Sequence, residues 1–354
     1  MALGRPPTTP ADKRIRELDG LRAVAVLTVV LYHFFQRFPN DFPYGDRIFP
    51  WVGFGYLGVH LFFMISGFAI AFTLNHASGP LVFIRHRFFR LWPPMLVCSL
   101  LTFVVMNVVD TPFTEARRVG VEAFLPSLTF IAPFIWDKII PVSNWIDGAY
   151  WSLFVEVRFY FWALVIATIF GNRNLAAALT GSAVALAIIW HLAPNAAVIF
   201  YLDTLFFVPY LPLFAAGVLT YQALTGLKTL RFYTGFTLIW IAEITMLANV
   251  TEYTLVSMFF LLFLILIERR AWLAVLTARP LVAIGLISYS LYLLHQNIGG
   301  AVLSSLPAGW PMWSYALVAL CVLGVIMLLA RGVYQFVERP SQSLARRFDQ
   351  RFPT

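Results

Sequence analysis

Charged residues are scarce in this sequence. Lys, Arg, Asp and Glu together make up 12% of the 354 residues, whereas apolar residues make up 60%. A typical soluble domain has about 25% charged and about 45–50% apolar residues. So few charges cannot cover the core of a soluble protein of this length. The composition therefore excludes a soluble enzyme, a disordered chain and a soluble nucleic-acid-binding protein.

Cysteine is scarce as well. Only Cys98 and Cys321 are present, each inside an apolar run. Two isolated thiols provide neither a disulfide framework nor the spacing of a metal site, and we interpret both as small apolar side chains. The sequence therefore predicts no bound metal. Gly53, Gly55 and Gly58 match a dinucleotide-binding pattern, but they follow no strand and lead directly into an apolar segment, so the match is accidental.

The sequence does contain a series of apolar segments, most of them long enough to cross a bilayer. We predict an all-α polytopic membrane protein with about ten transmembrane helices, forming one domain over residues 1–354 without a soluble domain. The predicted spans are residues 19–38, 55–75, 90–109, 150–170, 175–192, 202–224, 231–249, 253–268, 281–300 and 312–336.

The distribution of basic residues predicts the orientation of the chain. The net charge is +8. If the N-terminus lies in the cytoplasm, the inside segments carry 17 Lys and Arg residues and the outside segments carry five. Cytoplasmic segments of membrane proteins are enriched in these residues. The bias favours an even number of helices with both termini cytoplasmic. The outside residues are Arg37, Arg47, Arg117, Arg118 and Lys138.

Ionisable side chains at membrane depth are costly and are therefore functional candidates. Arg22 and His33 lie in the first predicted span. Their spacing of eleven residues brings them within about 20° of the same helix face and about 16 Å apart along the axis. Glu156 in the fourth span needs a partner on another helix. An imidazole is a suitable partner, because a carboxylate would fix its tautomer and raise its basicity.

Other polar and aromatic residues have two interpretations each. Arg87 and Arg90 set topology or clamp phosphates at the cytoplasmic start of the third span. Tyr292 and His295 share one side of the ninth span, where they hydrogen-bond to other helices or contact a substrate. Trp145, Tyr150 and Trp151 stack on sugars or anchor the chain at the membrane surface. Three more residues have no assigned role: His60, Asp203 and Glu243.

Several short motifs follow one another along the chain. They are Leu18-Asp19-Gly20-Leu21-Arg22-Ala23, Tyr32-His33-Phe34, Gly58-Val59-His60-Leu61-Phe62-Phe63, Ser66-Gly67-Phe68, Trp151-Ser152-Leu153, Ser288-Tyr289-Ser290-Leu291-Tyr292 and Phe336-Val337-Glu338-Arg339-Pro340. In this order the motifs strongly resemble the bacterial membrane-bound acyltransferase 3 family, over about residues 14–342. Members of that family O-acylate surface sugars, lipid-linked oligosaccharides and macrolide antibiotics.

The resemblance implies a multi-pass enzyme of the bacterial inner membrane that uses cytoplasmic acyl-CoA, usually acetyl-CoA, as co-substrate and has no tightly bound cofactor. The family's essential arginine and histidine match Arg22 and His33. Its paired arginines match Arg87 and Arg90, and its glutamate matches Glu156. His60 departs from the acidic or other polar residue often found at that position.

The sequence-based hypothesis is therefore an O-acyltransferase acting on a carbohydrate or macrolide hydroxyl, with His33 as general base and Glu156 orienting it. Direct transfer and a transient acyl-histidine both fit. The candidate residues for contacting the acceptor are Trp145, Tyr150, Trp151, Tyr292 and His295. The alternative is a proton-coupled transporter of a small polar substrate, because transporters also place His, Glu and Arg within the membrane.

Overall fold

The computed structural model describes residues 15–351 except 143, 194 and 227. This described part of the chain is helical and has no β-strand. Nine of its helical segments are long and apolar enough to cross a membrane, which confirms an all-α polytopic membrane protein. Three basic residues counted on the inside, Arg5, Lys13 and Arg14, lie outside the described residues.

The longer helices are α1 (Arg16–Phe35), α2 (Gly58–His76), α3 (Pro80–Val108), α7 (Trp151–Phe170), α8 (Leu175–Leu192), α9 (Ala196–Phe206), α10 (Leu211–Leu224), α11 (Leu230–Ile244), α12 (Val250–Glu268), α13 (Arg279–Ser304), α14 (Met312–Val333) and α15 (Arg339–Arg351). Short turns of helix connect them: η2 (Pro50–Leu57), α4 (Pro112–Glu115), η3 (Val121–Ala123), α5 (Phe124–Thr129), α6 (Pro133–Trp136), η4 (Gly148–Tyr150), η5 (Arg270–Thr277) and η6 (Tyr334–Glu338).

One predicted span is shorter than expected. Residues 231–249 were predicted to cross the membrane, but α11 has only 15 residues. At 1.5 Å per residue it is about 22 Å long, less than the roughly 30 Å of a hydrocarbon core. The helix stops because the next one begins early: the Asn249 side chain accepts the backbone N–H of Glu252 and caps α12.

Another predicted span, residues 202–224, is interrupted. Helix α9 ends at Phe206, and Phe207 adopts a left-handed conformation with φ of 43° before α10 begins. The break leaves backbone carbonyls without helical partners. The Arg158 guanidinium donates to the carbonyl oxygens of Asp203 and Thr204, and the Trp162 indole donates to that of Leu205 at 2.9 Å. Side chains of α7 thus donate hydrogen bonds to the backbone carbonyls at the end of α9.

Internal contacts divide the chain into two compact units. The first consists of Met1–Arg22, His60–His76 and Arg158–Val282, and the second of Ala23–Val59, Ala77–Val157 and Ala283–Thr354. Each unit is assembled from segments far apart in sequence, and helices α1, α2, α7 and α13 each contribute residues to both. The single domain inferred from the sequence stays a prediction.

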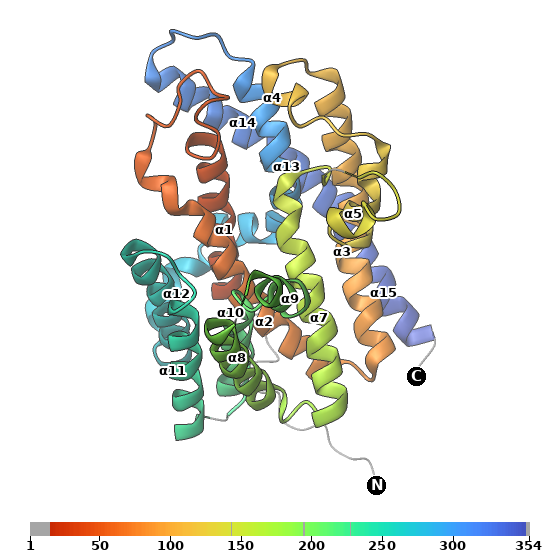
Figure 1. Cartoon of the computed structure of the whole chain (residues 1–354), viewed down its shortest axis with the longest axis vertical. Coiled ribbons are helices and arrows are strands. Elements are labelled where there is room, and N and C mark those ends of the chain that lie inside the picture. Colours follow the sequence, from red (N-terminus) through yellow and green to blue (C-terminus); the bar gives the residue numbers. More distant parts are fainter. Residues whose placement is uncertain (1–14, 143, 194, 227, 352–354) are drawn as a thin grey trace. The chain divides into compact units, whose positions relative to one another are not determined.

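In the first unit, α8, α10, α11 and α12 pack against one another, and Figure 1 shows α11 and α12 as neighbours. The start of α1 is held by Glu17, which accepts from the Nε and Nη2 of Arg270 at 2.8 and 2.7 Å. These hydrogen bonds raise the pKa of Arg270. The bidentate pair therefore fixes η5 against the beginning of α1.

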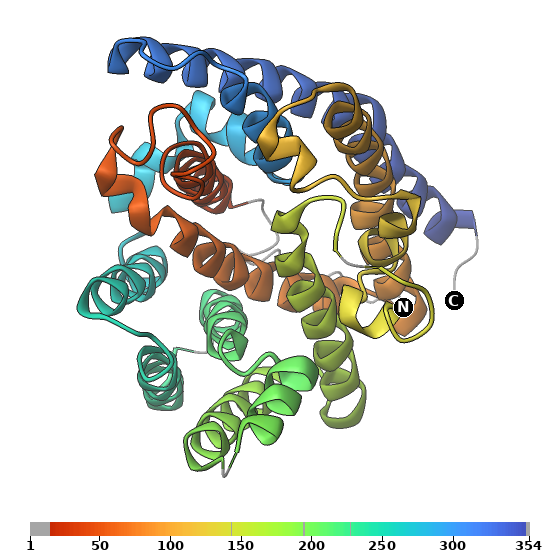
Figure 2. The ribbon, with the colours of Figure 1, turned by 45° about the horizontal axis from the view of Figure 1, so that its top comes forward.

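In the second unit, α15 packs along α3 (Figure 1), and Figure 2 shows α14 continuing through η6 into α15. Pro93 interrupts the hydrogen-bond ladder of α3, because it has no N–H to donate to the carbonyl of Phe89. The Ser341 hydroxyl donates to that carbonyl at 2.7 Å instead. The proline thus creates a docking point for α15.

Candidate functional site

Two histidines meet in the second unit. His33 lies near the end of α1, and His295 lies in the middle of α13 with no solvent exposure. The Nδ1 atom of His33 is 3.2 Å from the Nε2 atom of His295 and 2.9 Å from the carbonyl oxygen of Val29. The two ring centroids are 4.8 Å apart, with the rings nearly perpendicular.

The contacts of this pair assign the tautomers. His295 Nδ1 lies 2.7 Å from the carbonyl oxygen of Tyr292, and a carbonyl can only accept, so Nδ1 carries the proton. Its Nε2 is then a lone-pair acceptor. His33 Nδ1 faces that acceptor and the Val29 carbonyl, so it too carries the proton. Nε2 of His33 is left as the basic nitrogen.

The segment before α7 and its first turn hold α13 in place close to His295. The Asp147 carboxylate accepts the backbone N–H of Asn297 at 2.9 Å and that of Ala149 at 2.8 Å. The Tyr150 hydroxyl donates to the carbonyl oxygen of Leu293 at 3.2 Å. Asp147 is fully buried, and burial raises the pKa of its carboxyl to about 7. The side chains of Asp147 and Tyr150 therefore bind a backbone N–H and a backbone carbonyl that lie about one helical turn apart in α13, on either side of His295.

A second contact joins α13 to the start of α7. The hydroxyls of Ser152 and Tyr292 are 2.8 Å apart, and the Tyr292 hydroxyl lies 2.9 Å from the carbonyl oxygen of Ala149. Glu156, one helical turn beyond Ser152, interacts electrostatically with Tyr292. His33 Nδ1 is in contact with His295. The orientation of His33 by Glu156 stays a prediction.

The two arginines predicted to bind phosphate lie on α3. Arg90 is 3.6 Å from Glu338, which is 2% exposed and also accepts from Ser290 and Gln342. The Arg87 guanidinium lies 5.9 Å from the centroid of the Phe83 ring. These contacts hold both side chains on the half of α3 that α15 covers.

Two neighbouring residues of α3 contact the end of α15. The carboxylate of Asp349 pairs with Arg85 and with His86. Asp349 of α15 thus pairs with two consecutive residues that directly precede the predicted phosphate-binding arginines. The sequence had suggested no role for this helix.

Arg22 belongs to the first unit. Its Nη1 atom is 3.2 Å from the carboxylate of Asp19, three residues earlier on α1, and its side chain is 23% exposed. The pair joins an acidic residue of the first turn of α1 to an arginine about one helical turn later. The participation of Arg22 in catalysis stays a prediction.

The aromatic residues predicted near the acceptor differ in exposure. Trp151 is 38% exposed, Trp145 is 9% exposed, and Tyr150 is fully buried. Because the Tyr150 hydroxyl is used to hold Leu293, this residue supports α13 rather than lining an open surface. Tyr292 is also buried and supports the same junction.

The polar residues without an assigned role lie in the first unit. The His60 ring is 5.8 Å from the Tyr210 ring, and its Nδ1 atom is buried without a hydrogen-bond partner in the described structure. Glu243 on α11 is fully buried, and neither carboxylate oxygen has such a partner among the described residues. Asp203 interacts electrostatically with Arg158 at the break after α9. In the described residues no group of three or more His, Cys, Asp or Glu side chains could hold a metal ion.

The helices define a multi-pass membrane protein, and His33 of α1 and His295 of α13 contact each other near the end of α1. The sequence profile of the acyltransferase domain family, acyltransferase 3, matches residues 15–331. The chain belongs to this family.

The chain is similar to two relatives named as acyltransferases. The chain is 28% identical to acyltransferase MdmB of Streptomyces mycarofaciens over 152 residues, which are 43% of this chain and 38% of the relative. It is 29% identical to O-acetyltransferase OatA of Staphylococcus aureus (strain NCTC 8325 / PS 47) over 157 residues, 40% of this chain and 23% of the relative. The alignments thus span less than half of these relatives. No solved structure matches the chain.

Proposed function

We propose that the protein is an integral O-acyltransferase of the bacterial inner membrane. It moves an acyl group, acetyl in the simplest case, from acyl-CoA to a hydroxyl of a carbohydrate or macrolide acceptor. The observation that carries the proposal is the contact of His33 Nδ1 with the Val29 carbonyl and His295, from which we infer that Nδ1 holds the proton and Nε2 is the base. The family membership and the names of the two relatives support the same reaction.

The proposed reaction uses Nε2 of His33 as its general base. Nε2 of His33 removes the proton of the acceptor hydroxyl as the oxygen attacks the thioester carbonyl carbon. A C–O bond forms, the C–S bond breaks, and the protonated ring returns the proton to the leaving thiolate. The products are an acyl ester and the thiol of CoA. His295 stabilises the protonated ring because its Nε2 accepts from His33 Nδ1. An acyl-histidine route uses the same nitrogen as nucleophile.

The donor is proposed to bind at α3. Arg87 and Arg90 supply cationic donors to the phosphates of CoA, since guanidinium groups bind phosphate through several hydrogen bonds. Glu338 holds Arg90 in place through its own contacts with α13 and α15. Arg22 and Glu156 remain as further candidates for binding and orientation.

Thermal unfolding tests donor binding directly. The detergent-purified protein is melted with and without acetyl-CoA, alongside the double variant Arg87→Ala/Arg90→Ala. A ligand at 100 times its Kd stabilises the protein by roughly 2.7 kcal/mol. We expect a shift for the wild type, no shift for the double variant, and a wild-type shift for the control Arg118→Ala. The absence of a wild-type shift at millimolar acetyl-CoA would argue against this donor.

Transfer of a radiolabelled acetyl group to a mixture of bacterial glycans tests the chemistry. His33→Ala and His33→Gln should each lower the rate by roughly 100- to 10,000-fold, the usual contribution of a general base. Their melting temperatures should stay near that of the wild type, because the His33 side chain is partly exposed. A His33→Ala variant that retains activity would remove His33 from the mechanism.

A transporter remains the second candidate, and the interrupted segment of the first unit favours it. Broken helices at membrane depth are typical of transporter binding sites. Here α9 and α10 are separated at Phe207, and Glu243 is buried without a hydrogen-bond partner in the described chain. Proton-dependent uptake by protein-containing vesicles in the absence of acyl-CoA would support transport. Acetyl transfer without such flux would support the enzyme.

A further inference from the structure

A cluster of charged and aromatic side chains lies directly beyond His33 in the second unit. It consists of Arg37, Phe38 and Asp41 in the segment after α1, together with Phe113 of α4 and Arg117 just after it. The Phe38 ring is 6.2 Å from the His33 ring and 5.3 Å from the Phe113 ring. We call these five residues the His33 rim. Three of them, Arg37, Phe38 and Asp41, come just after the C-terminal end of α1.

Arg117 is held in one orientation by four contacts. Its Nη2 atom donates to the Asp41 carboxylate at 2.8 Å, and its Nη1 atom donates to the carbonyl oxygen of Phe113 at 3.2 Å. Its Cζ atom lies 4.7 Å from the centroid of the Phe38 ring and 4.1 Å from that of the Phe113 ring. The side chains of Arg117 and Asp41 nevertheless stay 28% and 24% exposed. The pair is therefore fixed but accessible.

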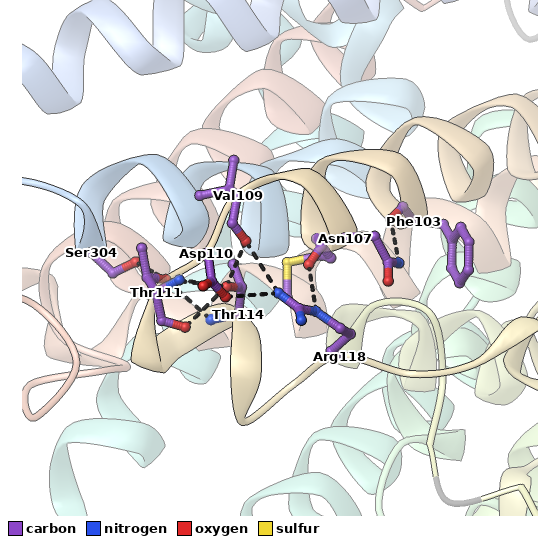
Figure 3. Close-up of polar contacts among 9 residues, drawn as sticks. Phe103, Asn107, Val109, Asp110, Thr111, Thr114, Arg118 and Ser304 are labelled. Carbon is purple, nitrogen blue, oxygen red and sulfur yellow. Dashed lines mark hydrogen bonds and ion pairs between the residues drawn. The ribbon is translucent and has the colours of Figure 1, made fainter.

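The backbone that carries Arg117 is also fixed. Thr111 and Thr114 form a capping box at the start of α4, and the Thr111 hydroxyl is 3.0 Å from that of Ser304 at the end of α13. Figure 3 shows these threonines and, beside them, Arg118. Arg118 points to the end of α3, where it donates to Met106, Val109 and Asp110. Two adjacent arginines therefore have different roles.

Arg37 provides a second cation on the same ring. Its Cζ atom lies 5.6 Å from the centroid of the Phe38 ring, its side chain is exposed, and it interacts electrostatically with His33. Within the described chain, no carboxylate forms an ion pair with Arg37. Arg117, in contrast, is neutralised by Asp41. The His33 rim therefore carries one positive charge, that of Arg37, which no ion pair in the described residues compensates.

We propose that the His33 rim is the acceptor subsite and that it binds a carbohydrate carrying an anionic group, a carboxylate or a phosphate, near the acylated hydroxyl. The Arg117–Asp41 pair offers donors and an acceptor for sugar hydroxyls, and Arg37 binds the anion. Guanidinium groups are suited to both carboxylate and phosphate. The inference rests on the proposed acyl transfer, because it needs His33 Nε2 to face the acceptor hydroxyl.

The test compares two arginine variants with a matched control. Arg37→Gln and Arg117→Gln each remove one charge of the His33 rim, and Arg118→Gln removes the same charge one residue away without a contact to Phe38. Transfer from labelled acetyl-CoA is measured with a glucuronate-containing oligosaccharide and its carboxyl-reduced form. A second pair of acceptors is a sugar linked to a polyprenyl phosphate and the same sugar as a methyl glycoside.

Loss of a charge-assisted hydrogen bond should raise KM for the anionic acceptor by roughly tenfold or more. We expect this rise in Arg37→Gln and Arg117→Gln, no rise in Arg118→Gln, and an unchanged KM for acetyl-CoA in all three. The carboxylate pair and the phosphate pair of acceptors distinguish the two sources of the anion. Equal KM values for charged and neutral acceptors in the wild type, unaffected by Arg37→Gln, would overturn the subsite while leaving the acyl transfer intact.

A binding measurement separates this inference from the enzyme assignment. Binding of the glucuronate oligosaccharide, and of the polyprenyl-phosphate sugar, is followed by microscale thermophoresis without acetyl-CoA. Weaker binding in Arg37→Gln than in Arg118→Gln supports the subsite even if no transfer is detected, in which case only the reaction is wrong. Binding that is absent, or equal in all variants, refutes the subsite whether or not acetyl transfer occurs.

Discussion

The Nδ1 atom of His33 faces the Nε2 atom of His295 at 3.2 Å, across the contact of α1 and α13. The contact is directional, because His295 Nδ1 is already committed to the Tyr292 carbonyl. In the proposed mechanism one imidazole therefore acts toward another as a carboxylate does in a catalytic triad, by accepting a hydrogen bond from the Nδ1–H of the base. A neutral ring does this without burying a negative charge in the bilayer.

This arrangement predicts different effects for two substitutions of His295. His295→Leu removes the acceptor for His33 Nδ1, whereas His295→Gln retains an oxygen that can accept. We expect the leucine variant to transfer acetyl roughly 10- to 100-fold more slowly, below the full contribution of a general base, and the glutamine variant to retain most activity. The measurement is kcat/KM against pH, with KM for acetyl-CoA as reference.

A positioning role has a pH signature that a purely structural role lacks. In His295→Leu the protonated form of His33 loses its stabilising acceptor, so the acidic limb of the profile should move to lower pH. A leucine variant with a wild-type rate and profile would show that His295 only packs α13 against α1. Equal losses in both variants would mean that the imidazole itself is needed.

Asp147 predicts a pH dependence of stability. Burial raises the pKa of its carboxyl to about 7, although two backbone N–H donors oppose the shift. Between the unfolded value of about 3.9 and this folded value, the folded protein holds a proton that the unfolded chain has lost. The stabilisation from that proton is complete below pH of about 4 and is lost as the pH rises through 7.

The melting temperature of Asp147→Asn should therefore decline less than that of the wild type between pH 5 and pH 8. The asparagine retains one acceptor oxygen and loses the other, which should cost about 1 kcal/mol at pH 5. Asp110→Asn is the control, since the Asp110 side chain is 89% exposed. Parallel pH profiles for wild type and Asp147→Asn would exclude Asp147 as the titrating group.

Hydropathy predicted most of the membrane architecture, because an apolar run of span length has few other structures available to it. It did not detect the interruption at Phe207, because Phe207 is apolar, but Pro209 was an available signal, since proline has no N–H to donate to a helix. Nor could it end the helix at Ile244, because that boundary depends on the cap at Asn249 and the apolar pattern continues through Thr245 and Met246.

The candidate site was predicted in part. His33, Tyr292 and His295 were all identified from their depth and spacing, and the structure brings them together. Periodicity could not show that His295 faces His33, because it relates residues on one helix and not residues on two. It also missed Asp147, which lies in the segment before a span. An acidic residue followed by Gly148 and a helix start was the available signal, since it is typical of an N-terminal cap.

Two glycines of the first unit predict a close helix crossing. A Cβ atom on Gly67 of α2 would lie 2.0 Å from the carbonyl oxygen of Phe214, and one on Gly217 of α10 would lie 2.0 Å from that of Met64. Backbone atoms cannot move aside as a flexible side chain can. Gly217→Ala should therefore lower stability by about 1–3 kcal/mol, measured as a lower melting temperature and a lower folded yield.

The matched control for this prediction is Gly181→Ala in α8, where an added Cβ meets nothing within 4 Å. Alanine has the higher helix propensity, so this variant should be as stable as the wild type or slightly more stable. If Gly217→Ala and Gly181→Ala melt at the same temperature, α2 and α10 do not approach each other as closely as these distances require.

Arg158 predicts the consequence of removing the cap on a broken helix. Its guanidinium donates to the carbonyls of Asp203 and Thr204, where α9 ends at membrane depth. Arg158→Met leaves the Thr204 carbonyl without this donor, at a cost of about 1–3 kcal/mol, whereas the Asp203 carbonyl still accepts the backbone N–H of Phe207. Arg158→Lys should recover only part of the loss, because one ammonium does not reproduce the guanidinium fork.

Arg173→Met, at an exposed position between α7 and α8, is the control. The melting temperatures should fall in the order wild type and Arg173→Met, then Arg158→Lys, then Arg158→Met. An Arg158→Met variant as stable as the control would show that water or lipid headgroups replace the guanidinium at the end of α9.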